Sequence, residues 1–189
     1  LVLPMLLTLG TGLFIRLVPS PGWIAGGLLL SGAFLAGLVT ALYHTVDRRD
    51  RFYATARFLV NLASYLIAFS LFAAIYDARL RSLQSATSIS LVTALLAVDL
   101  FNDSETRSWR TVMYALLTGF IVGQITWSLN WLPLSGLAGG VCLLLVFYIV
   151  TGIIQNAFLD RLNRATVIEF AGVTLAGLVV LLGIGSWAR

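Results

Sequence analysis

The residues best suited to chemistry are three charged side chains that lie within or beside long apolar stretches: Arg57, Asp99 and Glu169. An isolated charge is costly in a bilayer, so such groups are expected to pair with one another. We predict an intramembrane ion pair that joins helices, between Arg57 and either Asp99 or Glu169. A proton or ion relay is the alternative, and the absence of an acidic residue at mid-depth disfavours it.

Carboxamide side chains form a second candidate group. Asn61, Gln124 and Asn130 interrupt apolar stretches, and Gln124 lies nearest the middle of its stretch. They could line a small polar pocket for a ligand or a transported solute. The alternative is interhelical hydrogen bonding, worth about 0.6 kcal/mol per bond in membrane proteins. Because an unpaired amide is costly in hydrocarbon, Gln124 is expected to turn toward the protein.

His44 is the only histidine and Cys142 the only cysteine. One histidine does not make a metal site and the sequence has no HExxH motif, so no metal site is predicted. His44 could be the single axial ligand of a chlorophyll-type pigment or a haem. The alternative is a histidine in the headgroup zone, and the sequence leaves the identity of any cofactor open.

Asp99 and Asp103 are spaced four residues apart, near Glu105. Carboxylates at this spacing can hold Mg²⁺ against a diphosphate, as aspartate-rich motifs do in membrane prenyltransferases. An ordinary polar loop is the other interpretation, and the motif is sparse. The chain contains no lysine, which excludes a retinal Schiff base, a pyridoxal-phosphate site and a Walker-type phosphate loop. These residues favour a protein that is not an enzyme, and the sequence leaves the question open.

The elements that position these residues are predicted to be membrane-spanning helices. The 189 residues are 59% apolar and 11% charged, whereas soluble domains are about 45–50% apolar and about 25% charged. Every backbone polar group must be bonded within lipid, so each apolar stretch should be a helix. The sequence predicts an all-α, polytopic transmembrane bundle of about seven helices in a single domain, 1–189. The expected spans are 3–18, 23–43, 57–76, 83–101, 111–131, 137–158 and 165–187.

The arginines predict how the bundle is oriented. The loops after the second, fourth and sixth spans carry most of them: Arg48, Arg49, Arg51, Arg57, Arg107, Arg110, Arg161 and Arg164. By the positive-inside rule this side is cytoplasmic, which also places the N-terminus in the cytoplasm. We expect an integral protein of a cell membrane, the bacterial inner membrane. The net charge of +4 then indicates contact with lipid headgroups rather than with nucleic acid.

Glycines at four-residue spacing predict where helices meet. Gly119 and Gly123 lie in the fifth span, and Gly136 and Gly140 open the sixth. Such pairs let two backbones approach closely. We expect the fifth span to be a central helix that contacts at least two others.

Several short motifs in the second half of the chain carry a resemblance to a known family. They are Ser108-Trp109-Arg110, Gly123-Gln124-Ile125-Thr126-Trp127, Leu132-Pro133-Leu134 and Asp160-Arg161-Leu162-Asn163-Arg164 before Glu169. Over roughly residues 95–180 the sequence resembles an uncharacterised family of bacterial multi-span membrane proteins, a domain of unknown function. The resemblance implies neither an activity nor a site.

The short loops and glycine-rich helix faces favour a non-catalytic membrane subunit or scaffold of a larger assembly, for example an energy-transducing one. The expected partners are the lipid bilayer and other membrane subunits. A small-substrate transporter or ligand-binding bundle is the first alternative, and a lipid-diphosphate enzyme is the second.

Overall fold

The computed structural model describes residues 2–15, 21–45, 51–78, 81–101, 109–132, 134–158, 172–173 and 175–177. In this part of the chain the regular elements are all helices: α1 (Val2–Ile15), α2 (Pro21–His44), α3 (Tyr53–Asp77), α4 (Ser82–Phe101), α5 (Trp109–Leu129) and α6 (Gly136–Phe158). The predicted all-α fold class is confirmed. Of the predicted last span, 165–187, only residues 172–173 and 175–177 are described, and they are helical.

Five of the described helices, α2 to α6, are long and apolar enough to cross a membrane. The 25 residues of α3 extend roughly 37 Å at the helical rise, more than the roughly 30 Å of a bilayer core. Of the predicted first span, 3–18, residues 3–15 lie in α1, and residues 16–18 fall outside the described residues.

Two helices begin earlier than the apolar pattern predicts. α2 begins at Pro21 instead of Trp23, since proline has the right φ for the first helical position and needs no N–H donor there. α3 begins at Tyr53 instead of Arg57. Arg57 consequently lies one turn inside the helix, where its long side chain can reach back toward the membrane surface.

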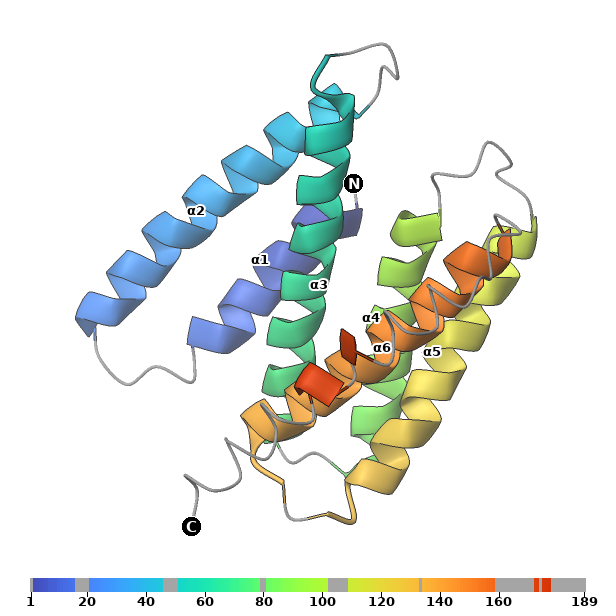
Figure 1. Ribbon diagram of the computed structural model, residues 1–189. Coiled ribbons are helices and arrows are strands. Elements are labelled where there is room, and N and C mark those ends of the chain that lie inside the picture. The colour runs from blue at the N-terminus through green and yellow to red at the C-terminus, as the bar shows by residue number, and fades with distance from the viewer. Residues whose placement is uncertain are drawn as a thin grey trace.

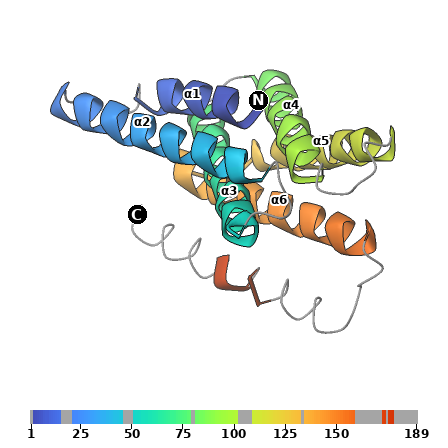
Figure 2. The ribbon, with the colours of Figure 1, turned by 90° about the horizontal axis from the view of Figure 1, so that it is seen from above.

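α3 is the central helix of the bundle and contacts α1, α2, α4 and α6. In Figure 2, α1 and α2 lie side by side, α4 and α5 lie toward the opposite side, and α6 crosses α3. α5 packs along α4 and against α6, as Figure 1 also shows. The prediction of two partners for the fifth span is therefore confirmed, but the prediction that this span is central is wrong.

The core between α3 and α6 is aromatic. Phe72 and Phe147 are fully buried, and their rings meet edge to face with centroids 6.0 Å apart. Tyr65 packs against Phe147 in the same geometry at 5.8 Å. Edge-to-face pairs add specific attraction to the packing of large side chains. This cluster joins the central helix to α6 across the middle of the bundle.

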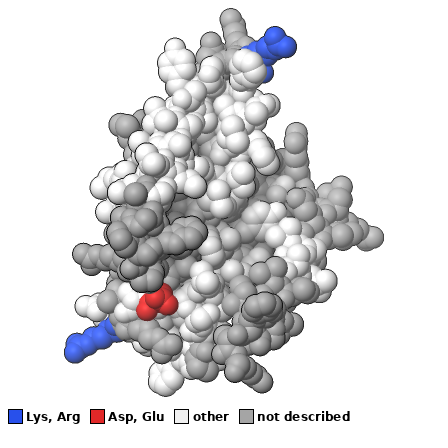
Figure 3. All heavy atoms as spheres, turned by 90° about the vertical axis from the view of Figure 1, so that its left-hand side faces the viewer, with Lys and Arg blue, Asp and Glu red and all other residues white. Residues whose placement is uncertain are grey.

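The described charged residues lie close to the ends of helices. Arg51, Arg57, Asp99 and Arg110 lie toward one end of the bundle, and Asp77 and Arg81 toward the other. Among the described residues on the face in Figure 3, blue atoms lie at the top and blue and red atoms toward the bottom, and those between them are uncharged. An apolar middle between two charged edges is the pattern of a protein that crosses a bilayer.

The arginine bias predicts which edge is cytoplasmic, and cysteine labelling tests the topology. In a Cys142→Ala background, Arg51→Cys should react with a membrane-impermeant maleimide from the cytoplasmic side. Leu132→Cys should react only from the opposite side, because α3, α4 and α5 lie between the two positions. Labelling of intact cells against inverted vesicles distinguishes the sides. Reaction of both cysteines from one side would contradict this topology.

Candidate functional site

The contact between α4 and α5 depends on glycine. A Cβ atom on Gly119 would lie 2.5 Å from the carbonyl oxygen of Ser90 and 2.9 Å from the Cβ of Ala94. A Cβ on Gly123 would lie 3.2 Å from the carbonyl oxygen of Ala86. The backbones are therefore closer than any other residue type would allow. The residues of α4 that face these glycines also have four-residue spacing: Ala86, Ser90 and Ala94. This spacing is a sequence signal for the contact that the glycines alone do not include.

The glycines of α6 meet the end of α3 in a similar way. A Cβ on Gly140 would lie 2.8 Å from the Cβ of Ala73. A Cβ on Gly136 would lie 2.5 Å from the side chain of Asp77. Both glycine pairs that the sequence singles out thus lie at helix contacts, one against α4 and the other against α3.

Tyr76 joins the end of α3 to the end of α5 through a hydrogen bond. Its side chain is buried, and its hydroxyl donates a hydrogen bond of 2.7 Å to the backbone carbonyl of Leu129. The aromatic ring fills the space over Gly139, where a Cβ would lie 2.5 Å from it. The carbonyls of the last helical turn have no partner within their own helix, so Tyr76 satisfies one of them. A tyrosine near the end of an apolar stretch predicts only a boundary position, so this contact is not visible in the sequence.

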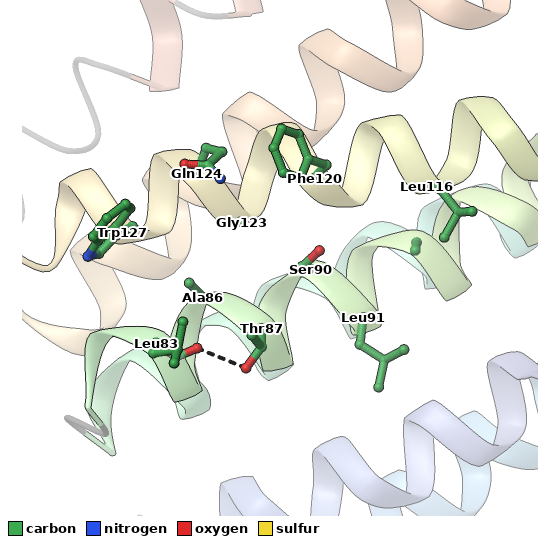
Figure 4. A pocket seen from close by; sticks show the side chains of 11 residues that line it. Leu83, Ala86, Thr87, Ser90, Leu91, Leu116, Phe120, Gly123, Gln124 and Trp127 are labelled. Atoms are coloured by element: carbon green, nitrogen blue, oxygen red, sulfur yellow. Dashed lines mark hydrogen bonds between the residues drawn. The ribbon is translucent and has the colours of Figure 1, made fainter.

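A groove opens on the outer side of the α4–α5 contact, with a volume of about 720 Å³. Its lining consists of Leu83, Ala86, Thr87, Ser90, Leu91 and Ala94 from α4, and Leu116, Phe120, Gly123, Gln124 and Trp127 from α5. Figure 4 shows the two helices side by side, with these side chains along the furrow between them. The groove is largely apolar and lies within two membrane-length helices.

Gln124 lines this groove and is exposed. The prediction that it turns toward the interior of the bundle is wrong. Gly119 and Gly123 face α4, and the next residue is rotated by about 100° on a helix, which carries Gln124 past the edge of α4. The Thr87 hydroxyl in the same groove is engaged with the Leu83 carbonyl at 2.8 Å. The Gln124 side chain forms no hydrogen bond with a described residue.

The other two amides have different surroundings. Asn130 follows the last turn of α5, and its Nδ2 donates a 2.7 Å hydrogen bond to the hydroxyl of Ser85 on α4. Asn61 is half-buried on α3. Neither of them lines the groove that contains Gln124. The amide of Asn130 therefore joins two helices, and the three amides do not gather in that groove.

Asp99 lies near one edge of the bundle, half-buried close to the end of α4. Leu3 in the first turn of α1 and Arg57 of α3 lie close enough to its carboxylate to favour the negative charge. Direct pairing with Arg57 stays a prediction, and Glu169 lies outside the described residues.

His44 ends α2 and is half-buried among aromatic rings. Its ring meets Tyr43 and Phe52 edge to face, with centroids 5.7 Å and 6.0 Å apart. Asp103 and Glu105, the other carboxylates of the diphosphate hypothesis, fall outside the described residues. Among the residues that are described, no group of three or more His, Cys, Asp or Glu side chains could hold a metal ion.

Gly119→Ala tests the close contact of α4 and α5. Replacing glycine by alanine ordinarily stabilises a helix by up to about 1 kcal/mol. At Gly119 the sign should reverse, with a loss of about 1–3 kcal/mol through overpacking, seen as a lower melting temperature in detergent. Gly12→Ala is the matched control, because nothing lies within 4 Å of a Cβ there. Equal melting temperatures for the two variants would rule out the tight contact.

Tyr76→Phe tests the link between α3 and the end of α5. Loss of the hydroxyl should lower the free energy of unfolding by about 1 kcal/mol, with the ring packing retained. Thermal unfolding of the purified protein measures the effect. Tyr43→Phe should leave the melting temperature unchanged, because Tyr43 is 76% exposed. A Tyr76→Phe variant as stable as the parent would show that the hydrogen bond contributes nothing.

The comparisons with known proteins identify a family but no activity. No curated protein and no solved structure matches the chain. A family model described as a protein of unknown function matches residues 1–184, well beyond the segment that carries the sequence resemblance. Because this match covers nearly the whole chain, the protein belongs to the DUF5656 family of proteins of unknown function.

Proposed function

We propose that this protein is a non-catalytic membrane subunit or scaffold that joins a larger assembly through α2. The supporting observation is how little of α2 is covered in the part of the chain that the structure describes. Only 11% of its apolar window is buried, against 39–50% in the other four membrane-length helices. A helix held this loosely has most of its surface available to another molecule in the membrane.

The glycines of α2 make a protein partner a better explanation than lipid. A Cβ on Gly26, Gly27, Gly32 or Gly37 would have nothing within 4 Å. Glycine in a helix costs about 1 kcal/mol relative to alanine, and a lipid-facing position offers no contact in compensation. A partner helix does, since small residues permit close packing where no hydrophobic force acts between helices.

A shallow groove beside α2 supports this proposal, because a partner helix could lie in it. It has a volume of about 250 Å³ between α2 and α3, and its lining is apolar: Ala33, Phe34, Gly37, Leu38, Ala41, Leu59, Leu62, Ala63 and Leu66. A partner seated there would touch α2 and the central helix together. The contact would therefore fix α2 against the bundle as well as holding the partner.

The surroundings of the polar residues also support a scaffold over a transporter. The amide of Asn130 is engaged in a hydrogen bond between helices, and Gln124 faces the outside of the described bundle. We place the protein in the bacterial inner membrane, with the arginine-rich edge and the N-terminus in the cytoplasm. The positive-inside rule is the basis for that orientation.

Gly32→Leu tests this role. The tagged protein, extracted gently from its native membranes, should co-purify with a stoichiometric membrane partner. Gly32→Leu should reduce the recovered partner at least tenfold, because the larger side chain blocks close approach. The melting temperature of the isolated protein should not change, since nothing lies within 4 Å of a Cβ at this position.

A photo-crosslinking residue supplies the matched comparison. Placed at Leu29, which is 77% exposed on α2, it should capture the same partner in the membrane. Placed at Phe58, which is 67% exposed on α3, it should not. Recovery of the chain alone, together with no crosslink from Leu29, would refute the proposed assembly role.

A further inference from the structure

The exposed amide of Gln124 is at odds with its surroundings. A carboxamide has two N–H donors and one carbonyl acceptor. Gln124 lies five residues before the end of α5, within a helix long enough to cross the membrane. Its side chain has no partner among the described residues. Hydrocarbon offers neither donor nor acceptor, and an unpaired amide there is costly, so a partner for Gln124 is expected beyond these residues.

The groove around Gln124 is shaped to receive large side chains. Phe120 and Trp127 lie one turn before and after Gln124, on the same side of α5 (Figure 4). Both are more than half exposed, at 61% and 56%. The groove is also lined by small residues, Gly123 on α5 and Ala86 and Ser90 on α4. The exposed rings of Phe120 and Trp127 thus lie beside a groove that is itself largely apolar.

We infer that this groove binds a second copy of the chain, with the two Gln124 carboxamides hydrogen-bonded to each other across a twofold axis. A carboxamide is self-complementary, because the donor of one copy meets the acceptor of the other. A twofold axis brings the same patch of both copies together. A lipid acyl chain would fill the apolar walls but would leave the amide unpaired.

The membrane fixes the geometry of this dimer. Both copies share one orientation in the bilayer, so the twofold axis lies along the membrane normal. Equivalent residues of the two α5 helices then meet at equal depth, Gln124 facing Gln124 and Phe120 facing Phe120. The inference does not depend on the α2 contact, which involves other helices.

Disulfide trapping tests the dimer with Gln124 intact. In a Cys142→Ala background, Phe120→Cys should form a covalent dimer when membranes are oxidised. Leu9→Cys, 51% exposed on α1, should remain monomeric. Adding Gln124→Leu to Phe120→Cys should reduce the dimer yield several-fold. Equal crosslinking at positions 120 and 9 would show random collision, and no crosslinking at 120 would overturn the interface.

A binding measurement isolates the contribution of the amide. Energy transfer between differently labelled copies in lipid vesicles should give a dissociation constant on the order of tenfold higher for Gln124→Leu. Gln124→Asn, which keeps a carboxamide, should restore part of the affinity. Unchanged affinity in Gln124→Leu would exclude the amide contact. A monomer in native mass spectrometry whose bound lipid is lost in Gln124→Leu would assign the groove to lipid instead.

Discussion

The close approach of helix backbones is the constraint on which the rest of this structure depends. In a bilayer the lipid tails are as apolar as leucine, so helices gain little by hiding large apolar side chains from them. Contact must then come from fitting surfaces, and glycine gives the closest fit. Gly119 and Gly123 bring α5 onto α4, and Gly140 brings α6 onto α3. The aromatic core around Phe72 and Phe147 fills the space that these contacts enclose.

Polar groups fix the relative positions of helices that the glycines bring together. Tyr76 joins the end of α3 to the Leu129 carbonyl at the end of α5, and Asn130 joins the end of α5 to the start of α4. Each bond lies near a helix end, where an unsatisfied backbone group or a membrane boundary makes it worth most. Gln124 departs from this pattern, because its exposed side chain forms no hydrogen bond with a described residue. Its amide is therefore the basis for inferring a partner outside these residues.

The sequence predicts the helices well because the signal for each one is local. Apolar length, Arg-rich loops and the Pro- and Gly-containing turns all lie within the segment that they define. The glycine contacts are also visible, since Gly119 and Gly123 share one face whatever packs on it. The rotation of α5 about its axis is not visible, because it depends on α4 residues such as Ser90. The Asn130–Ser85 bond likewise joins residues 45 positions apart. The sequence therefore indicates that Gln124 matters but not which way it faces.

The exposed face of α2 and the α4–α5 groove lie on different sides of the central helix among the described residues. α2 extends from one side of α3, while the α4–α5 groove belongs to the helices on the other side (Figure 2). Occupation of one surface leaves the other open, so contact with a second copy and contact with a partner are compatible. In a twofold dimer built on α5, both α2 helices would remain outside the dimer contact. Each copy could then hold its own partner helix against α2 and α3, and the dimer would place two such partners around one axis.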